Sequence, residues 1–272
     1  MVSFMTIDLK GKSLVVTGGG TGIGAETAIV AAEAGMRVCL CGRRMPPLEE
    51  TVERIRSSGG EAIAVKLDVT DPDSESHLLD AAEEAFGTPW AVFANAGRGL
   101  NRPVHETTDA EMQAIFEVNF FATHRLLAEA ARRMISHEQG GHLLACASCL
   151  SRFSIPRHGP YAATKASQDM LCQAMRLELK PHGIHVSSVH PITTRTEFFD
   201  VAAAHSGTSD YRAIEETPKL FVQSGRRVGK AVVRCLRKPR PEVWTSGMVR
   251  MATAARCLFP KLFDGKIKNL NR

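Results

Sequence analysis

A glycine-rich segment directly after a compact apolar run is the feature that most constrains this fold. Residues 13–17 read SLVVT, a β-branched run typical of a buried strand, and residues 17–24 continue as TGGGTGIG. Residues 22–34 have helical character and end at Gly35. Glycine has no Cβ, so such a loop lets the backbone approach a pyrophosphate, while the helix N-terminus offers N–H groups to the anion. The segment therefore predicts a dinucleotide-binding unit rather than a flexible turn.

Predicted strands and helices alternate along the chain as far as residue 245. The strands are expected at residues 13–17, 37–41, 62–67, 90–94, 141–147, 184–190 and 242–245. The helices are expected at residues 22–34, 48–56, 74–86, 109–137, 161–179 and 225–238. This alternation favours parallel strands with right-handed crossovers. We expect one α/β domain over residues 1–272: a single doubly wound Rossmann domain whose seven-stranded parallel sheet carries helices on both faces, plus a C-terminal helical extension.

Composition excludes several classes of protein. Apolar residues make up 44% of the 272 residues and charged residues 23%, which is typical of a folded globule. No apolar stretch is long enough for a transmembrane segment, and residues 1–12 do not read as a signal peptide, so a cytoplasmic location is expected. The seven cysteines include no C-x-x-C pair, which predicts reduced, mostly buried thiols and no metal site.

The positive net charge is confined to the end of the chain. Residues 1–224 sum to −6 and residues 225–272 to +11. With an acidic body and no recognition motif, nucleic acid is not an expected partner. Residues 246–272 form a basic extension, and residues 248–259 look like an amphipathic helix. This helix could cover a subunit interface, cap a substrate pocket or touch an anionic surface.

The glycine spacing G-x-x-x-G-x-G resembles that of the short-chain dehydrogenase/reductase family, in its non-extended branch, and the resemblance covers roughly residues 8–245. It implies a bound nicotinamide dinucleotide. Asp68 and Val69 resemble the family's adenine contacts, and residues 94–97 (ANAG) resemble its N-N-A-G element. The cofactor contacts implied by these three segments are Gly18, Gly20, Thr21, Gly22, Ile23, Gly24, Asp68, Val69, Asn95, Ala96 and Gly97.

The end of the second predicted strand bears on the choice of cofactor. A family member that prefers NAD usually carries Asp where this chain has Gly42, and the next residues are Arg43 and Arg44. Without that carboxylate, Arg43 can offer charge-assisted hydrogen bonds to a 2′-phosphate. The resemblance therefore favours NADP(H) over NAD(H). Thr21 argues the other way, because many NADP-using relatives have a basic residue there.

A tyrosine and a lysine four residues apart form the candidate catalytic pair. Tyr161 and Lys165 lie on one face of a helix that follows Gly159-Pro160. The phenol titrates near 10, and a nearby ammonium lowers that pKa by favouring the phenolate. Tyr161 could then exchange a proton with an alcohol or a carbonyl oxygen.

The resemblance adds two polar residues to this pair. Ser148, thirteen residues before Tyr161, matches the serine that hydrogen-bonds the substrate oxygen, with Ser151 as the alternative. Asn119 matches the asparagine that breaks the long helix locally and holds a water linking Lys165 to solvent. Lys165 would also hold the ribose hydroxyls, so Tyr161 and Lys165 count as both catalytic and cofactor-binding.

The chain departs from the family pattern after the sixth predicted strand. Ile192 replaces a glycine that tolerates positive φ, which allows a different loop path. Candidate cofactor contacts here are Pro191, Ile192, Thr194 and Thr196. Residues 195–222 would form a substrate lid whose apolar side chains either pack on the body or line an apolar pocket. Those side chains are Phe198, Phe199, Val201, Tyr211, Ile214, Leu220 and Phe221. His158 either faces substrate or sits exposed in a loop.

Together these residues predict an NADP(H)-dependent oxidoreductase acting on a CH–OH group. It would transfer a hydride between nicotinamide and a secondary alcohol or ketone, with a hydrophobic substrate expected. The alternatives are a non-catalytic NAD(P)-binding regulator and anionic-surface binding through the basic extension. By resemblance, a homodimer or homotetramer would form through residues 109–137 and 161–179.

Overall fold

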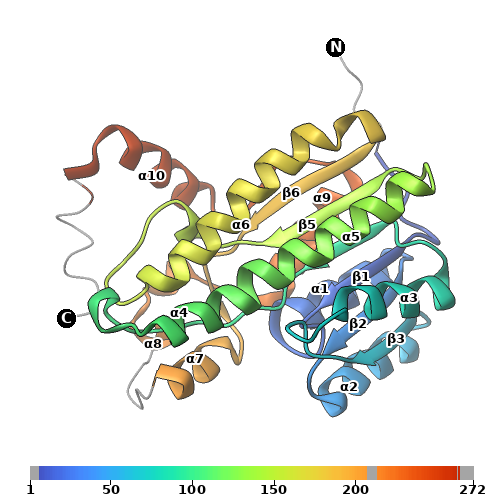
Figure 1. The fold of residues 1–272 in the computed structure, drawn as a ribbon, viewed down its shortest axis with the longest axis horizontal. Coiled ribbons are helices and arrows are strands. Elements are labelled where there is room, and N and C mark those ends of the chain that lie inside the picture. Colours follow the sequence, from blue (N-terminus) through green and yellow to red (C-terminus); the bar gives the residue numbers. More distant parts are fainter. Residues whose placement is uncertain (1–5, 207–212, 262, 264–272) are drawn as a thin grey trace.

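The computed structural model describes residues 6–206, 213–261 and 263, and its centre is a seven-stranded parallel sheet (Figure 1). Its strand order is β3 (Glu61–Lys66), β2 (Arg37–Gly42), β1 (Ser13–Thr17), β4 (Ala91–Ala94), β5 (Gly141–Cys146), β6 (Ile184–His190) and β9 (Glu242–Trp244). The order reverses between β1 and β4, which is where open α/β sheets bind ligands. The predicted doubly wound α/β fold with seven parallel strands is confirmed.

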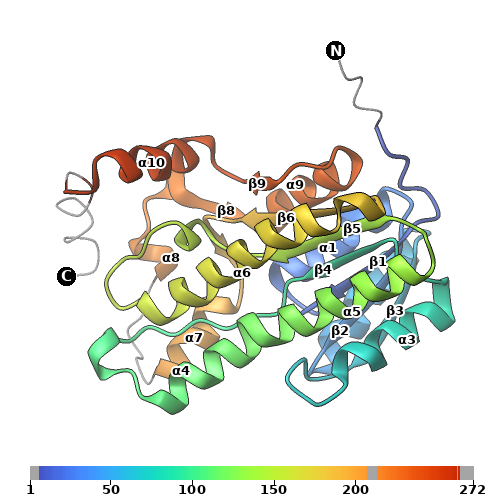
Figure 2. The same ribbon diagram turned by 45° about the horizontal axis from the view of Figure 1, so that its top comes forward.

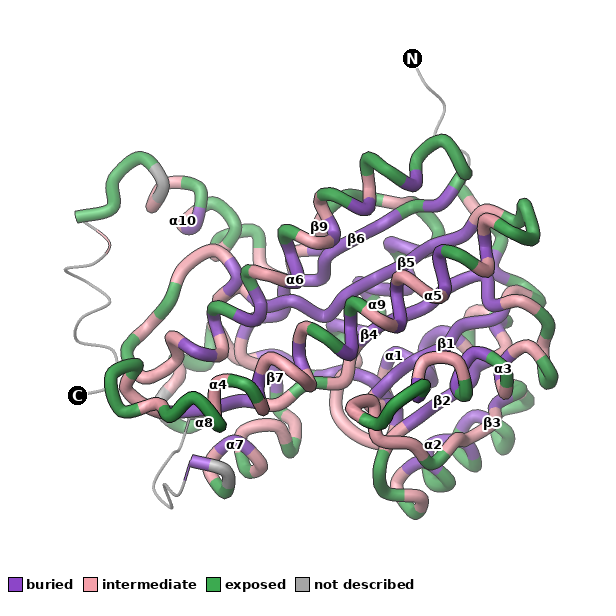
Figure 3. The backbone as a smooth tube through the Cα atoms, viewed as in Figure 1, coloured by how far each residue is buried: buried purple, intermediate pink, exposed green. Residues whose placement is uncertain are grey.

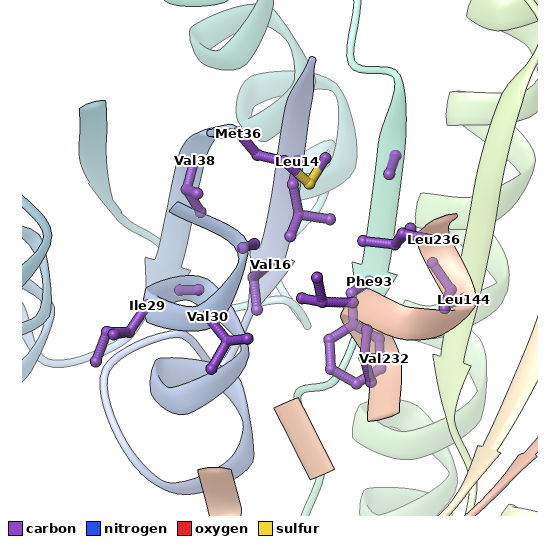
Figure 4. Packing of buried hydrophobic residues seen from close by; sticks show 14 of the residues in the cluster. Leu14, Val16, Ile29, Val30, Met36, Val38, Phe93, Leu144, Val232 and Leu236 are labelled. Carbon is purple, nitrogen blue, oxygen red and sulfur yellow. The ribbon is translucent and has the colours of Figure 1, made fainter. Parts of the chain in front are cut away.

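Helices cover both faces of the sheet. One face carries α1 (Gly22–Glu33), α2 (Met45–Ser57) and α9 (Gly225–Arg237), and the other carries α3 (Ser74–Phe86), α5 (Ala122–Ser136) and α6 (Gly159–Glu178). Successive strand residues point to opposite faces, so Leu14 and Val16 join the first core cluster and Val15 the second. Figure 4 shows Phe93 of β4 beside Val232 of α9, and Leu14 of β1 near Met36. Burial on both faces explains why central strands such as β1 and β4 are largely apolar (Figure 3).

The long helix expected at residues 109–137 is interrupted. It consists of α4 (Asp109–Phe116), a π-helical segment (Glu117–Phe121) and α5. Short π-helical segments inside α-helices are frequent at functional sites. Asn119 lies at the centre of this one, so the local break implied by the resemblance is present.

The structure also differs from the sequence-based expectations at the ends of several elements and around the lid. Helix α2 begins at Met45 rather than at residue 48, because Pro46 and Pro47 fit the first helical turn, where an N–H has no intrahelical partner. A second, two-stranded parallel sheet pairs β7 (Thr193–Arg195) with β8 (Val222–Ser224). The expected lid therefore begins and ends in strands.

The remaining elements are short or lie near the carboxyl ends of the main strands. They are the 3-10 turns Val104–Glu106, Cys149–Ser151, Lys180–His182 and Lys219–Phe221, and the helices α7 (Phe198–Ser206), α8 (Ala213–Glu216) and α10 (Gly247–Leu258). Figure 2 shows α7, α8 and α10 gathered at one end of the molecule. Tyr211 of the lid and residues 262 and 264–272 of the extension lie outside the described residues.

The cysteines that the structure describes are free thiols: Cys39, Cys41, Cys146, Cys149, Cys172 and Cys235. Burial raises the pKa of the Cys39 thiol to about 12 and that of Cys149 to about 11. Within the described ranges, no helix is both long enough and apolar enough to cross a bilayer.

Candidate active site

The carboxyl ends of the central strands open into a cavity of about 680 Å³, a size typical of small-molecule sites. Most of the residues singled out from the sequence line it: Gly18, Gly20, Thr21, Gly22, Ile23, Arg43, Arg44, Asp68, Val69, Asn95, Ala96, Gly97, Ser148, Tyr161, Lys165, Pro191, Ile192, Thr194 and Thr196. Gly24 and Asn119 are not part of the lining. Both lie against residues that are.

The glycines form a cradle in which side chains do not fit. A Cβ on Gly24 would lie 2.1 Å from the Gly18 carbonyl oxygen, and one on Gly22, where φ is +58°, would lie 2.8 Å from Thr196 Cγ2. A Cβ on Gly97 would come within 3.4 Å of Lys165 Nζ. Because side chains would collide at these positions, the cavity wall beside the start of α1 consists of backbone atoms. The residues present therefore fit the pyrophosphate of a dinucleotide cofactor.

Two neighbouring strands are tied together beneath this cradle. Asn95 Nδ2 donates to the Thr17 carbonyl at 3.0 Å, and the N–H groups of Asn95 and Ala96 donate to Thr17 Oγ1 at 3.0 and 2.9 Å. These hydrogen bonds thus hold the end of β1 against the end of β4, where the strand order reverses.

Basic residues surround the end of β2. The Arg43 guanidinium is largely exposed, with Nη1 4.0 Å from Asp68 Oδ2, whereas Arg44 donates a 2.7 Å hydrogen bond to Glu197 at the start of the lid. Arg98, which sequence reasoning missed, lines the same cavity. Burial and the nearby Arg43 cation lower the pKa of Arg98. Its only sequence signal is its position directly after the ANAG element.

The candidate catalytic pair meets in the cavity. Lys165 Nζ lies 5.6 Å from the centre of the Tyr161 ring and donates to the Cys146 carbonyl at 2.7 Å. Burial lowers the pKa of Lys165 to about 8, because the surroundings disfavour the charged form. An ammonium so close to the phenol favours the phenolate.

Asn119 stands behind this pair and holds the loop after β4. Its side chain accepts from the Arg98 N–H at 2.8 Å and donates to the Arg98 carbonyl and to Thr164 Oγ1, both at 3.0 Å. Its main-chain carbonyl accepts from Thr123 Oγ1 and from Gln168 Nε2. The resemblance implies that Asn119 holds a water linking Lys165 to solvent; in the structure, the Gln168 amide bridges the Asn119 carbonyl and Lys165.

Ser148, rather than Ser151, faces the cavity. Ser148 lies two residues after β5 in extended conformation, and its Oγ accepts from the Leu150 N–H at 3.1 Å. Ser151 is turned inward, where its hydroxyl donates to the Ser148 carbonyl at 2.7 Å. His190 Nδ1 lies 3.0 Å from the same carbonyl, and its ring stacks on Trp244 at 4.3 Å. Sequence reasoning did not single out His190, which is one of two histidines in a strand that also contains two serines.

The loop after β6 is held by Thr245. Ile192 avoids positive φ, and its N–H donates to Thr245 Oγ1 at 3.3 Å. Thr194 Oγ1 donates back to the Ile192 carbonyl at 2.8 Å. The loop therefore enters strand β7 with backbone angles that isoleucine tolerates.

The far end of the cavity is apolar and contains part of the C-terminal extension. Phe153, Phe198, Phe199, Val201 and Phe221 line it, and the Phe198 and Tyr161 rings lie 5.7 Å apart. Leu220, by contrast, is 70% exposed. Helix α10 contributes four lining residues: Val249, Ala252, Thr253 and Arg256. The described part of the extension thus forms a cavity wall.

His158 also lines the cavity. Its Nδ1 lies 2.9 Å from the Pro156 carbonyl, and burial lowers its pKa. Of the two alternatives left open by the sequence, a histidine facing the substrate end fits the structure better than one exposed in a loop.

Known proteins are similar to this chain in both sequence and fold. The family model for short chain dehydrogenase matches residues 12–206. The chain is 31% identical to an uncharacterized oxidoreductase, Lin0452, of Listeria innocua over 194 residues, 71% of this chain and 78% of that protein. It is 34% identical to the L-rhamnose 1-dehydrogenase (NAD(P)(+)) of a Sphingomonas species over 193 residues, 70% and 75% of the two chains.

A crystal structure of a short-chain type dehydrogenase/reductase from Mycobacterium marinum superposes with a TM-score of 0.80 at 28% identity, covering 89% of this chain and 96% of that one. The match of fold, glycine cradle and family model has one consequence. The chain belongs to the short chain dehydrogenase family and is an oxidoreductase with that family's NAD(P)-binding fold.

Proposed function

We propose that this protein is an NADP(H)-dependent oxidoreductase that interconverts a hydrophobic secondary alcohol and its ketone. One observation carries the proposal. The buried Lys165 ammonium lies beside the Tyr161 phenol in a cavity that is continuous with the glycine cradle. Acid–base chemistry and cofactor binding thus meet in one place.

Each polar group of the pair and its neighbours has a distinct role. A nicotinamide cofactor held in the glycine cradle would supply or accept the hydride. Tyr161 exchanges a proton with the substrate oxygen, and Ser148 hydrogen-bonds the same oxygen. Lys165 favours the Tyr161 phenolate and holds the ribose hydroxyls, while the start of α1 holds the pyrophosphate. Asn119 keeps the loop after β4 in place.

The preference for NADP(H) rests on the charges at the end of β2. Gly42 leaves no carboxylate to repel a 2′-phosphate, and the exposed Arg43 can pair with that phosphate. Arg98 faces the same cavity and feels the Arg43 cation, so an anion between the two would relieve their repulsion. Arg44 already pairs with Glu197, so it is the weaker candidate for binding the 2′-phosphate.

The substrate class follows from the apolar end of the cavity. Aromatic residues of the lid and the wall formed by α10 offer few charged partners, which suits a hydrophobic ketone or alcohol. Free buried thiols also fit a reducing, cytoplasmic location.

The test is turnover with a panel of aliphatic, cyclic and aromatic ketones and alcohols, followed through NADPH or NADP⁺ absorbance. Tyr161→Phe should lower kcat by about 10²–10⁴-fold, the usual contribution of a positioned acid or base, while cofactor affinity stays within about twofold. Wild-type turnover that survives in Tyr161→Phe would sink the assignment. Cofactor binding without turnover across the panel would favour a regulator instead.

A further inference from the structure

The side chain of Gln168 occupies the space between Lys165 and Asn119. We propose that Gln168 is a positioning residue: its amide fixes the Lys165 ammonium beside Tyr161 and takes the position that the resemblance assigns to a water. The inference deepens the proposed function and rests on it, since it concerns the same proton-transfer group.

Three hydrogen bonds hold the amide in place. Gln168 Oε1 accepts from Lys165 Nζ at 2.9 Å, and Nε2 donates to the Asn119 carbonyl and, at 2.8 Å, to Thr123 Oγ1. The side chain is 0% exposed. Gln168 follows Lys165 by three residues on α6, so the two share a helix face. The amide thus joins α6 to Asn119, at the centre of the π-helical segment.

The orientation of the amide is dictated by its partners. Lys165 has only donors, so the carbonyl end of Gln168 must face it, and the Asn119 carbonyl has only acceptor capacity, so the NH₂ end must face that. The Thr123 hydroxyl donates to the Asn119 carbonyl at 2.8 Å and is therefore free to accept from Nε2. A flipped amide would break the contacts with Lys165 and with the Asn119 carbonyl.

The Asn119 carbonyl, which has two lone pairs, accepts from two side-chain donors. They are the Thr123 hydroxyl and the Gln168 amide. An amide neither gains nor loses a proton near neutral pH, whereas a water exchanges with solvent. Proton exchange between the Tyr161–Lys165 pair and solvent therefore runs through the cavity rather than past Asn119.

The electrostatic consequence concerns the charge on Lys165. Its ammonium is held by two neutral acceptors, the Cys146 carbonyl and Gln168 Oε1. The titratable groups that face it, among the described residues, are the Tyr161 phenol and the Cys146 thiol. Burial disfavours the ammonium, so losing one acceptor would discharge Lys165 at lower pH and let the Tyr161 pKa rise.

The effect of Gln168 on the Tyr161 pKa can be measured without substrate, because the chain has two tyrosines, Tyr161 and Tyr211, and one of them can be removed. In a Tyr211→Phe background, the ultraviolet absorbance of phenolate reports Tyr161 alone. Gln168→Met keeps a similar volume but offers neither donor nor acceptor. We expect it to raise the Tyr161 pKa by about one unit and to lower kcat for alcohol oxidation at pH 7 about tenfold, with KM within about twofold.

A second variant separates positioning from packing. Gln168→Ala leaves room for a water between Lys165 and Asn119, so its Tyr161 pKa should lie closer to that of the parent than the Met variant's does. A folded Gln168→Met protein with unchanged titration and kcat would show that Gln168 serves packing alone. If that variant does not fold, Gln168→Asn replaces it, because a shorter amide cannot reach both partners; unchanged titration there overturns the proposal equally. A parent without turnover would contradict the proposed function, while the titration would still decide the role of Gln168.

Discussion

The proposed cofactor preference depends on single residues at the end of β2. Gly42 is the last residue of this strand, and a Cβ there would meet only the Leu48 side chain, at an ordinary contact distance of 3.6 Å. Its glycine is therefore not required by packing. What it contributes is the absence of a carboxylate beside Arg43, which is the basis of the proposed preference for NADP(H).

Gly42→Asp should reverse the cofactor preference. The new carboxylate would repel a 2′-phosphate and accept from the ribose hydroxyls of NAD⁺, so Kd for NADP⁺ should rise at least about tenfold while NAD⁺ binding holds or tightens. Calorimetric titration with each nucleotide measures both. Gly247→Asp adds the same charge at an open position of α10 and is the control. NADP⁺ affinity that is equal in both variants would remove Gly42 from the argument.

Among the secondary-structure elements, α10 contributes what the family pattern does not supply. Its residues 249, 252, 253 and 256 line the cavity, while Met251 and Ala254 of the same helix are exposed. An amphipathic helix of this kind was expected from the sequence, with three alternatives for what it covers. The structure places its inner face on the cavity, because the chain leaves β9 at the carboxyl edge of the sheet.

Ala252→Phe should narrow the substrate end without touching the cofactor. The larger ring would occupy cavity volume, so KM for bulky ketones should rise about tenfold while KM for NADPH stays within about twofold. Ala254→Phe, two residues away on the exposed side, should leave both constants near wild type. Steady-state kinetics on the two variants gives the comparison. Equal effects from both would mean that α10 does not contact substrate.

For the molecule as a whole, an exposed apolar surface remains on the side covered by α5 and α6, which lie side by side (Figures 1 and 2). Met170 and Leu177 of α6 are 64% and 75% exposed, and they share a helix face because they are seven residues apart. Phe121, at the end of the π-helical segment, is 46% exposed. These side chains support the proposal that copies of the chain associate through this face.

Met170→Glu should dissociate such an assembly. A carboxylate buried between two copies would face its own symmetry mate, so the mass measured by light scattering should fall toward that of one chain. Met251→Glu, on the exposed side of α10 with 74% exposure, is the matched control and should leave the mass unchanged. Dissociation by the control alone would move the interface to α10.

The sequence by itself determined the alternation of strands and helices, the glycine cradle and the pairing of Tyr161 with Lys165. Each is local: strand and helix periodicity, the missing Cβ and the four-residue helical spacing act within a few residues. Strands β7 and β8 escaped prediction because they pair with each other from the two ends of the lid, in a sheet separate from the main one.

Only the tertiary structure decided which groups meet across the fold. Gln168 reaches Asn119 over 49 residues of chain, and Arg44 reaches Glu197 over 153. Likewise, α10 closes a cavity whose glycine cradle comes from the start of the chain. Contacts of this kind depend on how whole elements pack, and a residue's own neighbours in sequence carry little information about that packing.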